Sequence, residues 1–251
     1  MHDRYIPPHE QDAWASRRRA QLRREPADHA APAVAAVVFD AYGTLFDVTS
    51  VETACTAITP DAAAFASLWR AKQLEYTWLR TLMGRYADFA TVTADALDYT
   101  LRRFAIAPDD ATRSRLLAAW QTLALYPDAQ TLLDQPPNLP LGILSNGTPA
   151  MLRALLDHAG VAQHFQAVLS VDAVHTYKPD PRVYALAPAA FGVAPDAILF
   201  VTANAWDAAG AQAAGLRAAW CNRAGLPFDT HSPAPHIELP SLAHLPEALA
   251  Q

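Results

Sequence analysis

The stretch AAVVFDAYGTL, residues 35–45, predicts the fold of this 251-residue chain. Its apolar first half ends in Asp40, and Gly43 and Thr44 follow within one short turn. An apolar run of this kind is typical of a strand that is buried on both faces of a parallel sheet, and the glycine indicates a turn. We therefore expect a central parallel strand with an acidic side chain at its carboxyl end.

Four more apolar runs in the second half of the chain have the character of buried strands. They cover residues 141–145, 167–171, 197–201 and 217–221. Helices are expected between them, because Thr148-Pro149 and Asp180-Pro181 are helix-start signals and residues 205–214 end at Gly215. This alternation predicts an α/β fold with a Rossmann-like parallel sheet that helices cover.

Residues 49–128 follow a different pattern, because helical periodicity runs through them without an apolar strand. Thr59 and Pro60 match a helix N-cap and first position. One apolar helix face is expected from Phe65, Leu68, Trp69, Tyr76, Leu79 and Met83, with further helices over about 91–105 and 109–124. We expect a helical cap domain at 49–128, inserted into a core domain formed by 34–48 and 129–251.

Residues 1–33 are polar and interrupted by prolines, and they contain the basic clusters 17–19 and 23–24. The sequence EPAD follows these arginines, where a secretory signal would have an apolar stretch. We interpret this segment as a poorly ordered N-terminal extension with solvated charges; a docking site for an anionic partner is the alternative.

The composition excludes several classes of protein. Hydrophobic residues are 52% of the chain, charged residues are 18% and the formal net charge is -6, so a nucleic-acid partner is not expected. No apolar run is long enough to span a membrane. Cys55 and Cys221 are far apart and outside any metal-ligand spacing, which fits a reducing cytoplasm.

Polar residues gather at four predicted strand ends. Asp40 with Thr44, Ser145-Asn146, Lys178, and Asn204 with Asp207 all follow or end an apolar run. Ligands of open parallel sheets bind beyond the carboxyl ends of the strands, so these residues are expected to share one site. Asp40 could act there as a carboxylate nucleophile or as a general base that activates water.

Several motifs resemble those of one known family. They are FDAYGTL at 39–45, LWR at 68–70, LEYTWLR at 74–80, SNG at 145–147, YKPD at 177–180 and NAWD at 204–207. From about residue 35 to 240 the chain resembles the haloacid dehalogenase superfamily, and within it the L-2-haloacid dehalogenases. The match in the helical insert makes the narrower resemblance specific.

This resemblance implies hydrolysis of short 2-haloalkanoic acids, L-enantiomers and haloacetates, to 2-hydroxy acids. Asp40 would form an ester with inversion at carbon, without a metal or other cofactor, in a homodimer joined by cap helices around residues 76–86. Two alternatives remain at this point, a magnesium-dependent phosphatase of the superfamily and a non-catalytic binding protein. The phosphatases have a second acid where this chain has Tyr42 and a metal-binding acid where it has Asn204, so phosphoryl transfer is not favoured.

The predicted catalytic residues are Asp40, Thr44, Lys178, Asn204 and Asp207. Thr44 would orient the Asp40 carboxylate, and Lys178 would balance the charges of Asp40 and Asp207. The resemblance implies that Asn204 and Asp207 position the water of the second step.

The remaining predicted site residues would bind the substrate. The resemblance implies that Arg70 and Asn146 bind the leaving halide. Ser145 and the backbone amides at Ala41 and Tyr42 would hold the substrate carboxylate, while Tyr184 would reach a neighbouring carboxylate or Arg70. The resemblance also implies an apolar pocket formed by Tyr42, Leu74, Phe89 and Trp206. Ala203 and Ala71 depart from the family pattern, which leaves open whether Thr202 supplies a missing hydroxyl.

Overall fold

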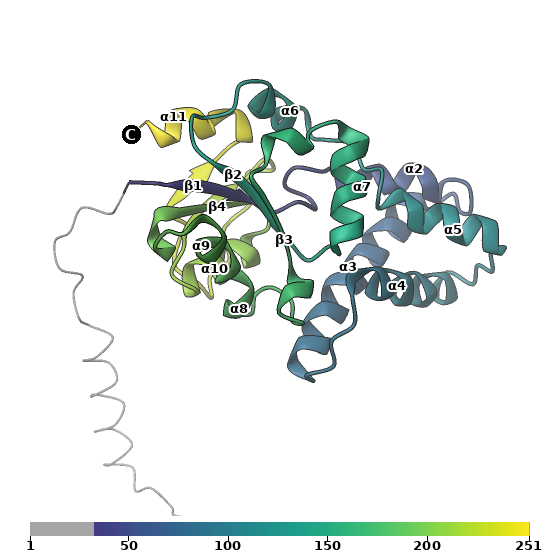
Figure 1. The fold of residues 1–251 in the computed structure, drawn as a ribbon. Coiled ribbons are helices and arrows are strands. Elements are labelled where there is room, and N and C mark those ends of the chain that lie inside the picture. Colours follow the sequence, from purple (N-terminus) through teal and green to yellow (C-terminus); the bar gives the residue numbers. More distant parts are fainter. Residues whose placement is uncertain (1–32, 251) are drawn as a thin grey trace, which may run out of the picture. The chain divides into compact units, whose positions relative to one another are not determined.

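The computed structural model describes residues 33–250, and a single sheet organises them (Figure 1). Its six strands are β1 (Ala36–Phe39), β2 (Leu141–Ser145), β3 (Ala167–Ser170), β4 (Ile198–Thr202), β5 (Arg217–Cys221) and β6 (Ile237–Leu239). Their order is β3-β2-β1-β4-β5-β6, and every neighbouring pair is parallel. The predicted α/β fold with a parallel sheet is confirmed.

Strand β1 lies inside the sheet between β2 and β4, and all four of its side chains are buried. Val37 pairs with Leu141 of β2 on one side and with Leu199 of β4 on the other. The strand order reverses direction between these two neighbours, and ligands bind at such a switch point in open α/β sheets. Asp40, the first residue after β1, therefore lies at the edge of the sheet where a ligand-binding site is most expected.

Helices and short 3₁₀ turns of the core connect the strands. The helices are α6 (Pro127–Asp134), α7 (Pro149–Ala159), α8 (Pro181–Tyr184), α9 (Leu186–Phe191), α10 (Ala205–Ala213) and α11 (Leu245–Leu249). The 3₁₀ turns are η1 (Val48–Ser50), η2 (Ala162–His164), η3 (Val171–Ala173), η4 (Pro195–Ala197) and η5 (Leu242–His244). Thr148 and Asp180 cap α7 and α8 with their side chains, as the helix-start signals predict.

Four helices of the segment 49–128 group to one side of the sheet (Figure 1). They are α2 (Val51–Cys55), α3 (Ala62–Leu82), α4 (Phe89–Arg103) and α5 (Asp110–Ala119). Polar contacts fix α3 on α4, since Trp69 Nε1 donates to Thr93 O at 2.9 Å and Gln73 Nε2 donates to Thr93 Oγ1 at 2.9 Å. The division into a core domain and a cap domain stays a prediction, because the described residues 33–250 lie within one compact unit.

The structure corrects the expected face and start of α3. The buried positions include Phe65, Trp69, Gln73 and Thr77, whereas the expected Leu79 and Met83 are 42% and 60% exposed. The apolar pattern missed this face because a polar residue, Gln73, is buried there with a hydrogen-bond partner. The helix begins at Ala62, and the Thr59 hydroxyl accepts instead from the Asp61 N–H at 3.2 Å.

Two further outcomes concern the ends of the chain. Strand β6 was not expected, because its three residues follow a proline-rich loop and give no periodic pattern.

The basic clusters 17–19 and 23–24 lie outside the described residues. Between residues 33 and 250, no helix has the length and apolar character needed to cross a membrane.

Candidate active site

Three donors from three separate segments hold the Asp40 carboxylate. Asp40 is only 6% exposed. Its Oδ2 accepts from Thr44 Oγ1 at 3.1 Å and from Asn204 Nδ2 at 3.0 Å, and its Oδ1 accepts from Lys178 Nζ at 3.1 Å. A carboxylate with donors on both oxygens is fixed in orientation, which is what a nucleophile or a base needs.

Lys178 joins the two acids of the site. Its ammonium lies 3.1 Å from Asp40 Oδ1 and 2.9 Å from Asp207 Oδ2, and its side chain is 1% exposed. The Phe200 ring lies beneath it, with its centroid 4.6 Å from Nζ. The expected charge balance has a geometric basis here, because one buried cation contacts both carboxylates. Between residues 33 and 250, no cluster of three His, Cys, Asp or Glu side chains could hold a metal ion.

Asp207 is fully buried near the start of α10, and its environment shifts its acidity. Burial raises the pKa of Asp207 to about 6, while Lys178 opposes the shift and the charge of Asp40 adds to it. The Tyr184 hydroxyl donates to Asp207 Oδ1 at 2.6 Å and favours the ionised form. Of the two expected partners of Tyr184, the structure therefore shows the carboxylate.

Gly210 makes room for this tyrosine. A methyl group at position 210 would overlap the Tyr184 hydroxyl and the ring of Pro179. Tyr184 is fully buried, and its ring lies edge-on to Phe200, 5.6 Å between centroids. The Tyr184 hydroxyl can reach Asp207 only because α10 carries no side chain at this point.

A second layer of hydrogen bonds orients Thr44. The Ala203 N–H donates to Thr44 Oγ1 at 2.9 Å, so the hydroxyl proton of Thr44 is directed to Asp40. The Thr202 hydroxyl accepts from the Asn204 N–H at 3.1 Å and lies 3.5 Å from Thr44 Oγ1. Thr202 thus supplies a hydroxyl beside the position where Ala203 departs from the family pattern.

Arg70 on α3 brings a cation from the helical insert to the site. Its Nη1 donates to Gln73 Oε1 at 3.3 Å, and its guanidinium lies 5.8 Å from the centroid of the Trp120 ring. Burial lowers the pKa of Arg70, and the negative charge of Asp40 opposes that change. The two groups thus influence each other electrostatically without a direct ion pair among the described residues, which suits the binding of a further anion.

Ser145 and Asn146 lie at the end of β2, beside the end of β1. Phe39, the last residue of β1, pairs with Ile143, and Ser145 lies two residues further along β2. The Ser145 hydroxyl accepts from the Gly147 N–H at 3.2 Å, and Asn146 Oδ1 accepts from the Lys178 N–H at 3.2 Å. The second bond ties the SNG turn to the lysine that contacts both acids.

Only some of the residues expected to form an apolar pocket make ring contacts in this region. The Tyr42 ring lies 5.7 Å from Phe89 and 6.1 Å from Trp120, between centroids. Trp206 is half-buried at the start of α10 and packs edge-on to Trp78 at 5.5 Å. Leu74 is half-buried on α3, one turn after Arg70, and no contact with another expected pocket residue is described for it.

Arg223 is a residue of this region that the motifs did not indicate. Its Nη2 donates to the Thr44 carbonyl at 2.8 Å, and its Nε and Nη2 each donate to Asp128 at 2.9 Å. It also stacks on Tyr126, 4.0 Å from the ring centroid. Arg223 holds the turn after Asp40 from outside, and its place just beyond the end of β5 is the sequence signal that could have identified it.

The chain is similar to several known proteins. A family model described as haloacid dehalogenase-like hydrolase matches residues 34–215. The chain is 47% identical over 210 residues to an (S)-2-haloacid dehalogenase of Pseudomonas sp. (strain YL), covering 82% of this chain and 90% of that protein. It is 39% identical over 218 residues to haloacetate dehalogenase H-2 of Moraxella sp. (strain B), covering 84% and 97%.

A solved structure is similar in fold as well. It is L-2-haloacid dehalogenase of Xanthobacter autotrophicus with chloropropionic acid covalently bound. The TM-score is 0.81 at 40% identity, and the match covers 86% of this chain and 98% of that one.

Removing the Tyr184 hydroxyl is expected to raise the pKa of Asp207 above its value of about 6, because the hydrogen bond that favours the carboxylate is lost. An infrared titration of Tyr184→Phe would follow the carbonyl stretch of the protonated acid. The Asp207→Asn variant, which lacks that band, assigns it. An unchanged midpoint in Tyr184→Phe would show that the hydroxyl does not tune this acid.

Proposed function

This chain belongs to the haloacid dehalogenase-like hydrolase family, and we propose that it hydrolyses short 2-haloalkanoic acids to 2-hydroxy acids. Haloacetates and L-2-haloacids are the expected substrates. The observation that supports this most directly is the Asp40 carboxylate, which is held by Thr44, Asn204 and Lys178 with Tyr42 two residues on. The site thus has a fixed nucleophile, and a tyrosine rather than an acid stands two residues after it, where an acid could protonate a leaving group.

In the first proposed step, an Asp40 oxygen attacks the carbon that bears the halogen. A C–O bond forms as the C–halogen bond breaks, and the halide leaves with the bonding electron pair, so no proton is transferred. Arg70 and Asn146 stabilise the departing anion, while Ser145 and the backbone N–H groups at Ala41 and Tyr42 bind the substrate carboxylate. The rings of Tyr42, Phe89 and Trp206, with Leu74, surround the alkyl part.

In the second proposed step, water hydrolyses the ester at the carbonyl carbon of Asp40. Asp207 takes a proton from this water, since a pKa of about 6 leaves the carboxylate ionised at neutral pH and basic enough to accept it. Asn204 and Lys178 position the water and the ester carbonyl. The acyl C–O bond of the ester then breaks, and the proton held by Asp207 passes to the departing alkoxide oxygen. The hydroxyl of the product therefore carries an oxygen atom that belonged to Asp40, and the Asp40 carboxylate is restored with an oxygen from water.

The proposed reaction needs no metal ion. Halide is a weakly basic anion and leaves without Lewis-acid help or a proton. The residues also fit a magnesium site poorly, because the Lys178 ammonium already bridges Asp40 and Asp207. A phosphatase would need an additional carboxylate at one of the positions that Tyr42 and Asn204 occupy.

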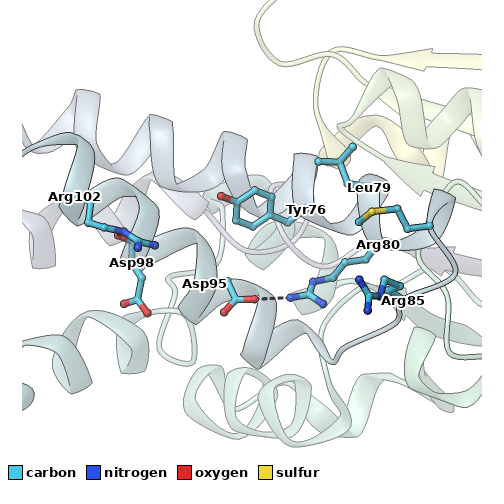
Figure 2. Close-up of a pocket in the computed structure, with 8 residues that line it drawn as sticks. Tyr76, Leu79, Arg80, Arg85, Asp95, Asp98 and Arg102 are labelled. Carbon is cyan, nitrogen blue, oxygen red and sulfur yellow. Dashed lines mark hydrogen bonds and ion pairs between the residues drawn. The ribbon is translucent and has the colours of Figure 1, made fainter.

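We also propose that two copies of the chain associate through the end of α3. Leu79, Leu82 and Met83 are 42%, 83% and 60% exposed there. Figure 2 shows Leu79 and Tyr76 beside a pocket whose charged lining includes the Arg80–Asp95 ion pair of 2.5 Å. Apolar side chains rimmed by charges of both signs suit a self-complementary two-fold interface.

A single turnover in heavy-oxygen water tests the chemistry, with enzyme in excess over (S)-2-chloropropionate and EDTA present. We expect chloride release, a lactate product without heavy oxygen, and heavy oxygen on the peptide that contains Asp40. Heavy oxygen in the product and none on that peptide would make Asp40 a general base. No halide release from any haloacid, or release only with added magnesium, would contradict the proposed function.

Arg70→Ala is expected to lower kcat/KM for chloroacetate by about 10- to 150-fold, because one charge-assisted contact with the leaving anion is lost. Arg70→Lys keeps the charge and should recover part of this loss. Arg115→Ala on α5 is the matched control, since its side chain is exposed. Full activity of Arg70→Ala on every haloacid tried would remove Arg70 from the site.

Lysine substitutions at Leu82 and Met83 are expected to weaken the dimer by at least about a hundredfold, because each buried apolar side chain contributes twice across a two-fold axis. Sedimentation equilibrium of the double variant against the unmodified chain measures this. Leu226→Lys is the control, as Leu226 is 60% exposed in the loop after β5. A monomeric unmodified chain at micromolar concentration would reject the proposal.

A further inference from the structure

The Tyr42 hydroxyl is a buried polar group without a partner in residues 33–250. Tyr42 is 2% exposed, and its hydroxyl makes no hydrogen bond to any described group. Leaving a buried hydroxyl unpaired is unfavourable, and folded proteins rarely do so without a functional reason. A phenylalanine would provide the same ring for packing against Phe89 and Trp120 without this cost.

The position of the hydroxyl indicates what it could bind. A methyl group built on Gly147 would lie 3.2 Å from Tyr42 Oη and 2.8 Å from Cε2, so the phenol end lies against the SNG turn, next to Asn146. The charges of the site also influence the pKa of this hydroxyl. Burial raises the pKa of Tyr42 most, Arg70 lowers it and Asp40 raises it. The unpaired donor is therefore close to both residues of the proposed halide pair.

Building on the proposed function, we propose that the Tyr42 hydroxyl donates a hydrogen bond to the departing halide and helps to set which halogens the enzyme removes. It is a third donor beside Arg70 and Asn146. The C–halogen bond breaks with its electron pair going to the halide, and the hydroxyl keeps its proton throughout, since burial holds its pKa far above neutral pH.

The size of the halide decides how much this bond contributes. Fluoride is small and accepts hydrogen bonds strongly, chloride less so, and bromide least. A neutral hydroxyl therefore discriminates among halides, whereas an apolar wall of the same shape would act mainly through volume. The negative charge that develops on fluorine as its bond to carbon breaks is therefore stabilised most by this donor.

The test compares Tyr42→Phe with the unmodified enzyme on fluoro-, chloro- and bromoacetate. The measured quantity is kcat/KM for halide release, which reports the steps up to halide departure. We expect a loss of about 10-fold or more for fluoroacetate, a smaller loss for chloroacetate and less than about threefold for bromoacetate. If the unmodified enzyme releases no fluoride, the chloride-to-bromide ratio of kcat/KM is compared in the same way.

Thermal unfolding gives a second readout, because Tyr42→Phe removes an unpaired buried hydroxyl and should leave Tm unchanged or higher. Tyr99→Phe on α4 is the matched control and should alter neither quantity. An equal loss for all three halides, or no loss, would overturn the inference while leaving the proposed function intact. Absence of halide release by the unmodified enzyme would instead reject the proposed function itself.

Discussion

The buried ion triad of Asp40, Lys178 and Asp207 is the interaction on which the site depends. One cation serves two carboxylates, and all three groups are almost fully removed from water. Such an arrangement is favourable only when the remaining hydrogen-bonding capacity of the acids is met. Thr44 and Asn204 meet it for Asp40, and Tyr184 meets it for Asp207. The residues around the triad therefore contribute to its stability as well as to the proposed chemistry.

The sheet topology brings these groups together, which explains why much of the site could be predicted from the sequence. Asp40, Ser145 and Asn204 each end or follow an apolar run, and the carboxyl ends of parallel strands meet at one edge. Once the alternation of strands and helices is recognised, the polar residues at the strand ends can be assigned to one site without knowing any contact between distant segments. The fold class could be predicted for the same reason, since its signals are local.

The parts that could not be predicted depend on contacts between distant segments. From the sequence alone, Gln73 is expected on the surface, because its hydrogen-bond partner Thr93 belongs to another helix, α4. The prediction therefore put the buried face of α3 at the wrong residues. Arg223 follows an ordinary strand end, and its role appears only once Asp128 and the Thr44 carbonyl lie beside it. Strand β6 is three residues long, so its pairing with β5 rather than any pattern of its own defines it.

The bare backbone at Gly210 makes positions 184 and 210 an epistatic pair. Any side chain at 210 would displace the tyrosine hydroxyl from Asp207 and press on Pro179, one residue from the triad lysine. Such a change would be accommodated more readily in a lineage that had already lost the tyrosine hydroxyl, and in that intermediate the acidity of Asp207 would differ. Laboratory libraries that vary one position at a time would reject side chains at 210 while the tyrosine is present.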